Sequence, residues 1–312
     1  MRVQLRLSVI FLDKIREREY NETKPKTISI FASLAKRQLI FAGAFVRTVS
    51  PEEWIAENSI QEVIPMKAVI LAAGQGKRLR GSGPDVPKVL RELQGKPLLS
   101  HVLQAIDFIS PAYTVLVVGY AREAVISAYP EYPYAVQEQQ LGTGHATASA
   151  EEALQDYDGP VLVGYGDMPL VRRETYLRLL EQHRTQGNAC TILTGITDEC
   201  DSFGRILRKE DGSVYDIRER RDCSPEQAAV REKNSGVYLF DARLLFSALK
   251  RVKNENAQGE YYLTDVPKLL IADGYSVGAL ALEGEDAVEI FGVNGPEDLA
   301  LCEQVLERRK QG

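Results

Sequence analysis

Short apolar runs alternate with helix-like stretches from residue 66 onward, and this alternation constrains the fold more than any other feature. Three runs are typical of buried strands, because each is brief, apolar and has a glycine at or just after its end: Lys67–Ala73, Thr114–Val118 and Val161–Tyr165. Helical periodicity occupies the stretches between and after them: Leu98–Ile109, Ala146–Leu154 and Glu174–His183. Strand, helix, strand predicts an α/β fold whose parallel sheet carries helices on both faces.

The segment Thr191–Phe240 is richer in short strands and contains turn signals such as Asp211-Gly-Ser. We therefore expect antiparallel strands to be added, giving a mixed, mostly parallel, Rossmann-like sheet. Ligands of such sheets bind beyond the carboxyl ends of the strands. Residues that directly follow the strands are therefore the candidates for a functional site.

Charge divides the chain near residue 66. Residues 1–50 carry ten Lys and Arg against four Asp and Glu, whereas residues 66–312 carry 28 against 36. The basic segment lacks the aromatic interleaving that is typical of nucleic-acid binders. We expect residues 1–65 to be an extension of unknown role and residues 66–312 to form the functional domain, with neither nucleic acid nor membrane as partner.

The four cysteines favour a reduced, cytoplasmic setting. They show no C-x-x-C pairing, so we interpret them as packing residues rather than zinc ligands or a redox dithiol: Cys190, Cys200, Cys223 and Cys302. No uncharged apolar run approaches the ~18 residues of a membrane-spanning helix. We expect a soluble protein.

A glycine-containing loop, Leu71-Ala-Ala-Gly-Gln-Gly-Lys-Arg78, follows the first predicted strand. Glycine lets backbone N–H groups approach phosphate oxygens, and Lys77 and Arg78 add positive charge. The loop lacks the third glycine of the dinucleotide fingerprint and the G-x-x-x-x-G-K-[ST] of P-loop NTPases, so it supports neither class. By itself it also fits an ordinary strand-to-helix turn, but Pro87-Lys88-Val-Leu90 adds a further lysine downstream.

An ordered set of nine segments resembles the uridylyltransferase (pyrophosphorylase) half of the bacterial bifunctional UDP-N-acetylglucosamine enzyme, a sugar nucleotidyltransferase. They are Leu71-Ala-Ala-Gly-Gln-Gly with Arg78; Pro87-Lys-Val-Leu90; Gln137 with Gln140-Leu-Gly-Thr-Gly-His-Ala146; Tyr165-Gly-Asp167; Phe203-Gly-Arg205; Glu219; Asn234-Ser-Gly236; Asn256-Ala-Gln-Gly-Glu-Tyr-Tyr-Leu-Thr-Asp265; and Gly292-Val-Asn294. The resemblance implies a nucleotide-diphospho-sugar transferase fold. It also implies that UTP and N-acetylglucosamine 1-phosphate are the substrates and pyrophosphate a product.

The resemblance also implies roles for individual residues. Two cations, Arg78 and Lys88, would grip the triphosphate between two anionic reactants. Asp167, which closes a strand, and Asn294 would hold Mg²⁺, an ion that needs few protein ligands. The implied nucleotide-binding residues are Leu71, Ala72, Ala73, Gly74, Gln137, Gly142, Thr143, Tyr165 and Gly166. The implied sugar-binding residues are Gly204, Glu219, Asn234, Tyr262 and Thr264.

Several of these residues also have plain structural interpretations. The amide of Gln137 matches the O4 and N3–H edge of uracil. Glu219, in contrast, lies in a charged run that suggests a solvated loop rather than a sugar contact. Asn294 precedes Gly295-Pro296 and fits a turn. Arg78 and Lys88 could be surface cations, and we interpret His145 as a structural residue of its helix.

Two departures from the family pattern affect the functional expectation. The segment between Arg78 and Lys88 is about three residues longer than expected, and only 312 − 294 = 18 residues follow Asn294. We therefore expect one final helix and no acetyltransferase β-helix, and we expect a chain that starts at Met66 to keep its fold and activity. Two alternatives stay open, namely a nucleotidyltransferase for another sugar phosphate or nucleotide and a non-catalytic sugar-nucleotide-binding regulator.

Overall fold

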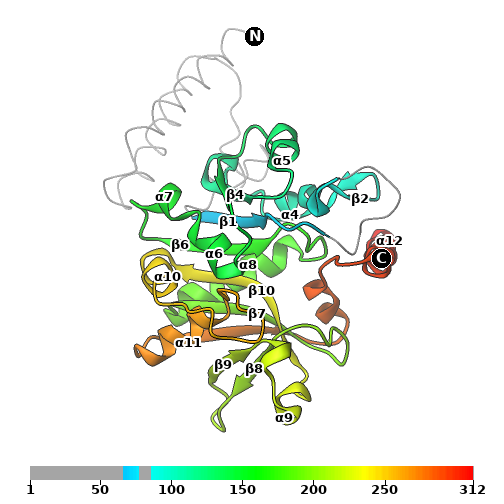
Figure 1. The fold of residues 1–312 in the computed structure, drawn as a ribbon. Helices are drawn as coiled ribbons and strands as arrows, with labels where there is room; N and C mark the ends of the chain where they lie inside the picture. The colour runs from blue at the N-terminus through cyan, green and yellow to red at the C-terminus, as the bar shows by residue number, and fades with distance from the viewer. Residues whose placement is uncertain (1–65, 77–85, 312) are drawn as a thin grey trace, which may run out of the picture. The chain divides into compact units, whose positions relative to one another are not determined.

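The structure is a computed structural model that describes residues 66–76 and 86–311. A nine-stranded sheet lies at the centre of the described part (Figure 1). Seven of its strands follow one another in space in this order: β11 (Val277–Leu282), β7 (Cys190–Ile196), β10 (Glu232–Asp241), β6 (Pro160–Tyr165), β1 (Lys67–Ala72), β4 (Thr114–Val118) and β5 (Tyr134–Val136).

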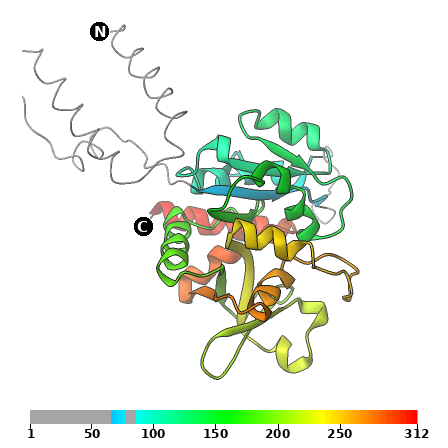
Figure 2. The ribbon, with the colours of Figure 1, turned by 90° about the vertical axis from the view of Figure 1, so that its left-hand side faces the viewer.

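The sheet combines a parallel half with antiparallel additions. β1 pairs in parallel with β4 and β6, and β4 pairs in parallel with β5. β10 runs antiparallel to both β6 and β7, while β11 is parallel to β7. A hairpin of β8 (Arg205–Arg208) and β9 (Val214–Arg218) attaches to β10 and extends below the main sheet in Figures 1 and 2. The expected mixed, mostly parallel sheet is therefore confirmed.

Each face of the sheet has its own hydrophobic core, because side chains alternate along the strands. In β1, Ala68 and Ile70 belong to one core and Val69 and Leu71 to the other. The first core is covered by α4 (Leu98–Ala105), α8 (Arg173–Gln186) and α12 (Pro296–Gln311), and α5 (Arg122–Ala128) contributes to it. The second is covered by α6 (Thr143–Ala148), α7 (Glu151–Leu154), α10 (Ala242–Leu249) and α11 (Asp265–Ala272).

Short elements connect the larger ones. They are the 3-10 turns η2 (Lys88–Leu90), η3 (Pro111–Tyr113), η4 (Arg220–Asp222) and η5 (Gly284–Ile290), the small strands β2 (Glu92–Leu93) and β3 (Lys96–Pro97), and helix α9 (Pro225–Ala228). Of these, η2 matters most for the site, since it carries Lys88.

The helices differ from their predicted bounds where polar groups or glycine intervene. The stretch predicted as one helix, Ala146–Leu154, forms α6 and α7, and the Ser149 hydroxyl between them donates to the His145 carbonyl (3.0 Å) instead of pointing to solvent. The helix predicted to reach Ile109 ends at Ala105. α8 runs on to Gln186 because Gly187, with a φ of 61°, provides a left-handed helix end.

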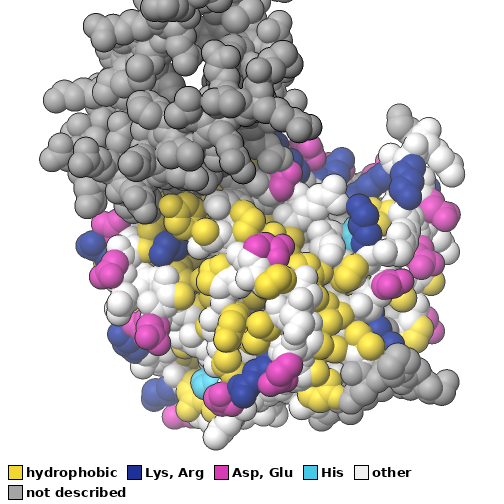
Figure 3. Space-filling model, turned by 90° about the horizontal axis from the view of Figure 1, so that it is seen from above, with side chains coloured by type: hydrophobic (Ala, Val, Ile, Leu, Met, Phe, Trp, Pro, Cys, Tyr) yellow, Lys and Arg dark blue, Asp and Glu magenta, His cyan; other side chains and the backbone are white. Residues whose placement is uncertain are grey.

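The described cysteines are all free thiols, and Cys190 and Cys302 are fully buried packing residues. Within residues 66–76 and 86–311, no helix has both the length and the apolar character needed to cross a membrane. On the face seen from above in Figure 3, basic and acidic side chains lie side by side around apolar ones.

Candidate active site

The loops that follow the parallel strands are tied together by hydrogen bonds. The carbonyl of Leu71 accepts from the backbone N–H of Gly166 (3.0 Å), which joins the end of β1 to the end of β6. The Ala73 carbonyl accepts from the Gln140 side chain (2.7 Å) and from the backbone N–H of Tyr120 (3.3 Å). Because parallel strands share a carboxyl edge, residues predicted from separate segments meet there.

A charged corner, made of Lys88, Asp167 and Asn294, lies at this edge. The Lys88 ammonium forms an ion pair with the Asp167 carboxylate and donates to Asn294 Oδ1 (2.8 Å). Asp167 follows β6, and the backbone N–H of Val293 donates to the Asp167 carbonyl (2.9 Å), which brings the C-terminal segment alongside. Three residues predicted separately from the sequence thus touch one another.

Gly76 makes the approach of the first loop to Lys88 possible. Its φ is 60°, and a Cβ on this residue would lie 2.7 Å from the Lys88 Cβ. A larger residue would therefore be strained and would push the loop away from the lysine. Arg78, the second predicted cation, lies outside the described residues, as does most of the longer segment that leads to Lys88.

The oxygens of the charged corner fit a hard divalent cation. Asp167 and Asn294 both contact one ammonium group, so their side-chain oxygens face the same place. The described residues contain no group of three or more His, Cys, Asp or Glu that could hold a metal. Carboxylate and amide oxygens suit Mg²⁺, which keeps several waters and shares phosphate oxygens of a substrate.

A cluster of uncharged groups around Gln137 and Gly142, called the neutral pocket below for its proposed role, lies beyond the end of β5. The Gln137 side chain is 5% exposed. Its Nε2 donates to the Gly142 carbonyl (3.0 Å) and lies 3.2 Å from His145 Nδ1. Gly142 has a φ of 111°, and a Cβ there would lie 2.6 Å from the Tyr261 carbonyl oxygen. His145, which we expected to serve only its helix, is partly exposed and contacts a predicted base-binding residue.

Thr143 and Tyr165 link the first residue of α6 to the end of β6. Thr143 Oγ1 accepts from the backbone N–H of Leu263 (3.0 Å) and is hydrogen-bonded to the Tyr165 hydroxyl. Burial raises the pKa of Tyr165 far above its usual value. The ring lies against the backbone of Gly236, where a Cβ would collide with it. Tyr165 therefore packs between the Thr143 hydroxyl and the Gly236 backbone.

Glu219 is partly buried rather than fully solvated. It accepts from the Thr264 hydroxyl (3.0 Å), and Thr264 itself is buried. Burial raises the pKa of Glu219, and the nearby carboxylates of Asp222, Asp265 and Glu260 raise it further, while the Thr264 hydrogen bond lowers it. The side chain is therefore less solvated than its charged neighbours suggest, because the local run does not reveal the hydrogen bond with Thr264.

The remaining predicted sugar-binding residues lie close by. The backbone N–H of Asn234 donates to the Gly204 carbonyl (2.9 Å). The Asn234 amide is engaged within the protein, since Nδ2 donates to the Tyr238 hydroxyl (2.7 Å) and Oδ1 accepts from the Gly236 N–H (3.3 Å). The Tyr262 hydroxyl accepts from Gln258 (2.8 Å). Their contact with a sugar stays a prediction.

Comparison with known proteins places this geometry in a family. The model of the MobA-like NTP transferase domain matches residues 68–263. The chain belongs to this NTP transferase family. Two relatives named bifunctional protein GlmU are similar to it in sequence. One, from Acetivibrio thermocellus, is 44% identical over 245 residues, and the other, from Streptococcus mutans, is 43% identical over 243 residues. Each alignment covers 78% of this chain and 52% of the relative, so the chain spans about half the length of these curated relatives.

A solved structure supports the fold of this NTP transferase domain. The glucose-1-phosphate thymidylyltransferase from Bacillus anthracis, in complex with a sucrose, aligns with a TM-score of 0.61 at 20% identity. The alignment covers 77% of this chain and 94% of that one. At this identity the likeness shows a shared architecture, and it confirms the predicted fold class.

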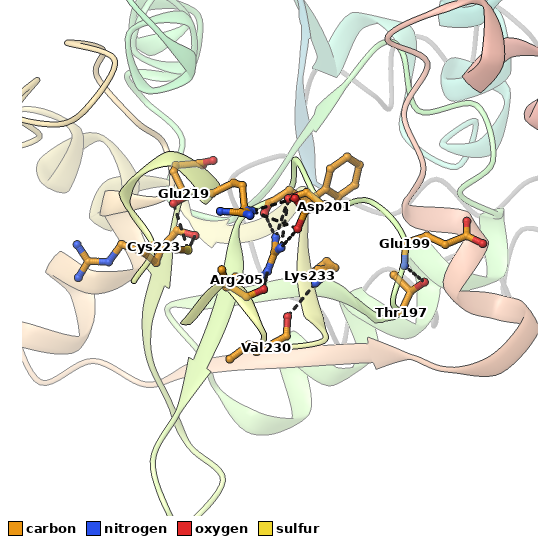
Figure 4. Close-up of polar contacts among 12 residues, drawn as sticks. Thr197, Glu199, Asp201, Arg205, Glu219, Cys223, Val230 and Lys233 are labelled. Carbon is orange, nitrogen blue, oxygen red and sulfur yellow. Dashed lines mark hydrogen bonds and ion pairs between the residues drawn. The ribbon is translucent and has the colours of Figure 1, made fainter. Parts of the chain in front are cut away.

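The NTP transferase domain anchors its Gly204 segment with a fully buried arginine (Figure 4). Arg205 donates from Nε to the Ala228 carbonyl (3.0 Å) and from Nη2 to Asp201 Oδ1 (2.7 Å). Asp201 in turn accepts from the Arg220 side chain (3.1 Å), next to Glu219 in the sequence. The sequence marked Arg205 only as part of a motif, and its anchoring role depends on contacts that the motif does not contain.

Two other residues support the NTP transferase site, and the sequence analysis gave neither of them a role of its own. Gln140 links the loop after β5 to Ala73, as described above. Gly119, at the end of β4, leaves no room for a side chain, because a Cβ there would lie 2.9 Å from the Ala73 Cβ and 3.2 Å from the Gln137 carbonyl oxygen. The position of Gly119 directly after a buried strand was the one sequence signal that could have predicted this close backbone approach.

Proposed function

We propose that this chain transfers the uridylyl group of UTP to N-acetylglucosamine 1-phosphate. A phosphate oxygen of the sugar phosphate attacks the α-phosphorus of UTP, and the bond from that phosphorus to the bridging oxygen of the β-phosphate breaks. The products are UDP-N-acetylglucosamine and pyrophosphate, which leaves with the electron pair of the broken bond. The observation that most supports this proposal is the charged corner, where Lys88 contacts Asp167 and Asn294. The Gln140 side chain, next to the neutral pocket, is hydrogen-bonded to the Ala73 carbonyl of the first loop. Identity of 43–44% to the GlmU relatives supports the same assignment.

The charged corner is proposed to handle the phosphates. Lys88 and Arg78 supply positive charge where two anionic reactants must meet, and the stabilisation is greatest where negative charge develops during transfer. Asp167 and Asn294 would hold Mg²⁺ together with substrate phosphate oxygens. When bound, that ion supplies charge neutralisation and orients the triphosphate. The backbone of Leu71, Ala72, Ala73 and Gly74 provides a surface for close approach of the nucleotide, and Gly74 has open space around its Cα.

The neutral pocket is proposed to read the base. Gln137 directs Nε2 toward Gly142 and His145, so its Oε1 is left to accept from the N3–H of uracil. No described residue accepts from the backbone N–H of Gly142, which is suited to donate to O4 of the base. Thr143 lies next along the chain, and Tyr165 and Gly166 continue the wall. Cytosine presents the reverse pattern at N3 and position 4 and would leave both groups mismatched.

The sugar is proposed to bind on the side of Glu219. Glu219 is a partly buried carboxylate whose only described side-chain hydrogen bond comes from Thr264, so it has acceptor capacity left for sugar hydroxyls. Gly204, Asn234 and Tyr262 complete this side. A carboxylate that is desolvated in the free protein gains strongly from donors that a sugar brings.

Measurement of pyrophosphate release tests this function. The four nucleoside triphosphates are each paired with N-acetylglucosamine, glucosamine and glucose 1-phosphate in the presence of Mg²⁺. We expect UTP with N-acetylglucosamine 1-phosphate to give the highest kcat/KM. A higher value for a different nucleotide or sugar phosphate would replace the assignment, and no release with any pair would leave a binding protein.

A further inference from the structure

The orientation of the Gln137 side-chain amide decides which base the neutral pocket can read. One edge of the amide is an acceptor and the other carries two donors. With Oε1 toward the base, the side chain accepts from the N3–H of uracil. With the amide reversed, Nε2 would instead donate to N3 of cytosine, which has no hydrogen there. Base selection therefore requires that something fixes the amide.

Two groups on the loop and first turn of α6 contact the donor edge of this amide. Gln137 Nε2 lies 3.0 Å from the Gly142 carbonyl oxygen and 3.2 Å from His145 Nδ1. The Gly142 oxygen can only accept, and it also accepts from the backbone N–H of Ala146 (3.0 Å). The Gly142 contact therefore favours the orientation with Nε2 inward, and no described residue donates to Oε1 of Gln137.

The tautomer of His145 follows from this arrangement. Nε2 of Gln137 is a donor, so the facing Nδ1 of His145 must be an acceptor with a free lone pair. The ring proton is then on Nε2 of the imidazole. A proton on Nδ1 would place two donors face to face and would favour the reversed amide.

We infer that His145 is a positioning residue for base selection: its Nδ1 lone pair holds the Gln137 amide with Oε1 turned toward the nucleotide. The inference rests on the proposed function of this site. His145 lies in the first turn of α6, two residues after Thr143 and three after Gly142, so one short segment carries both the proposed base contact and its support. Because Gln137 is almost fully buried, a reversed amide would leave polar groups without partners.

The tautomer can be measured without any substrate. Long-range ¹H–¹⁵N spectra of the full chain distinguish a ring nitrogen that carries a proton from one that has a lone pair. We expect Nδ1 of His145 to be the unprotonated nitrogen at neutral pH. A proton on Nδ1 would overturn the inference, whatever reaction the chain performs.

Substitution then tests the effect on selection. His145→Ala should lower the UTP-to-CTP ratio of kcat/KM about fivefold, the equivalent of one ordinary hydrogen bond, through KM with little change in kcat. In His145→Asn, the side-chain Oδ1 can replace the Nδ1 acceptor, so most of the ratio should return. A purely structural role would change stability and leave the ratio unchanged.

His183 provides the matched control. It is buried on α8, and its Nδ1 lies 3.0 Å from the Thr191 hydroxyl, away from the proposed site. His183→Ala should leave the UTP-to-CTP ratio unchanged even where it lowers stability. An unchanged ratio in His145→Ala, with UTP still preferred by the native chain, would overturn the positioning role. No preference for UTP in the native chain would instead overturn the proposed function, while the tautomer measurement still decides the inference.

Discussion

The charged corner and the neutral pocket are built in opposite ways. In the charged corner, side chains from three distant segments meet at the Lys88 ammonium, which contacts both Asp167 and Asn294; Lys88 and Asn294 are 206 positions apart. In the neutral pocket, the contacts are hydrogen bonds between backbone groups and uncharged side chains. Gly142 fits there only because it lacks a Cβ. The first arrangement suits charge neutralisation, and the second suits selection by hydrogen bonds that are costly to leave unmade.

The difference predicts which kinetic quantity each region controls. Interactions that strengthen as charge develops at phosphorus change kcat, whereas contacts that are equal in the bound and reacting states change KM. Variants in the charged corner should therefore reduce turnover. Variants in the neutral pocket should reduce affinity and selectivity for the nucleotide.

The largest expected effect is that of Asp167→Asn, which would break the charged corner. Loss of the carboxylate removes the partner of Lys88 and one proposed metal ligand, so kcat should fall by about a hundredfold or more. Steady-state kinetics at saturating UTP measure it, and circular dichroism checks the fold. Asp158→Asn is the control, because Asp158 and its partner Arg243 form an exposed pair. Full activity with excess chelator would contradict the metal assignment.

Gly142→Ala should have the next largest effect. It tests whether the neutral pocket depends on the close approach of the Gly142 and Tyr261 backbones. A left-handed φ and a Cβ 2.6 Å from the Tyr261 carbonyl oxygen together should lower the free energy of unfolding by about 3 kcal/mol. Urea unfolding measures this loss. Gly74→Ala is the matched control, since nothing lies within 4 Å of its Cβ position; its stability should be unchanged. Equal stability of the two variants would refute the argument.

Gln137→Ala tests whether the neutral pocket controls the KM for UTP and the charged corner controls kcat. Removal of the amide should weaken the use of UTP by ~1–3 kcal/mol, the cost of an unsatisfied polar partner, and should narrow the preference over CTP. The kcat at saturating UTP should change much less than in Asp167→Asn. Parallel kinetics with UTP and CTP provide the measurement. An unchanged ratio would count against Gln137 as the residue that reads the base.

The smallest expected effect is on stability, in Glu219→Gln. Burial raises the pKa of Glu219, so the folded protein binds this proton more tightly than the unfolded chain, and the ionised carboxylate costs stability at neutral pH. The glutamine variant should be more stable at pH 7.5, and the gain should shrink as pH falls and vanish below about pH 4, where both states are protonated. Urea unfolding at both pH values measures it, with exposed Glu210→Gln as control. A gain that persists at pH 4 would contradict the pKa argument.

The sequence by itself determined three central parallel strands and the positions where function was to be sought. β4 has the bounds that its apolar run predicts, and β1 and β6 differ by one residue at one end, because burial on both faces of a parallel sheet requires continuous apolar residues. The segments resembling sugar nucleotidyltransferases pointed to Lys88, Asp167 and Asn294 individually.

Tertiary structure alone decided what those residues touch. Three contacts join segments that lie far apart or on different elements: that of Lys88 with both Asp167 and Asn294, the hydrogen bond between Thr264 and Glu219, and the contact of His145 with Gln137. Periodicity and capping are local and can be read from a short window of sequence. Contacts between distant segments depend on strand order and on which side chains the sheet faces bury, and those are properties of the whole packed chain.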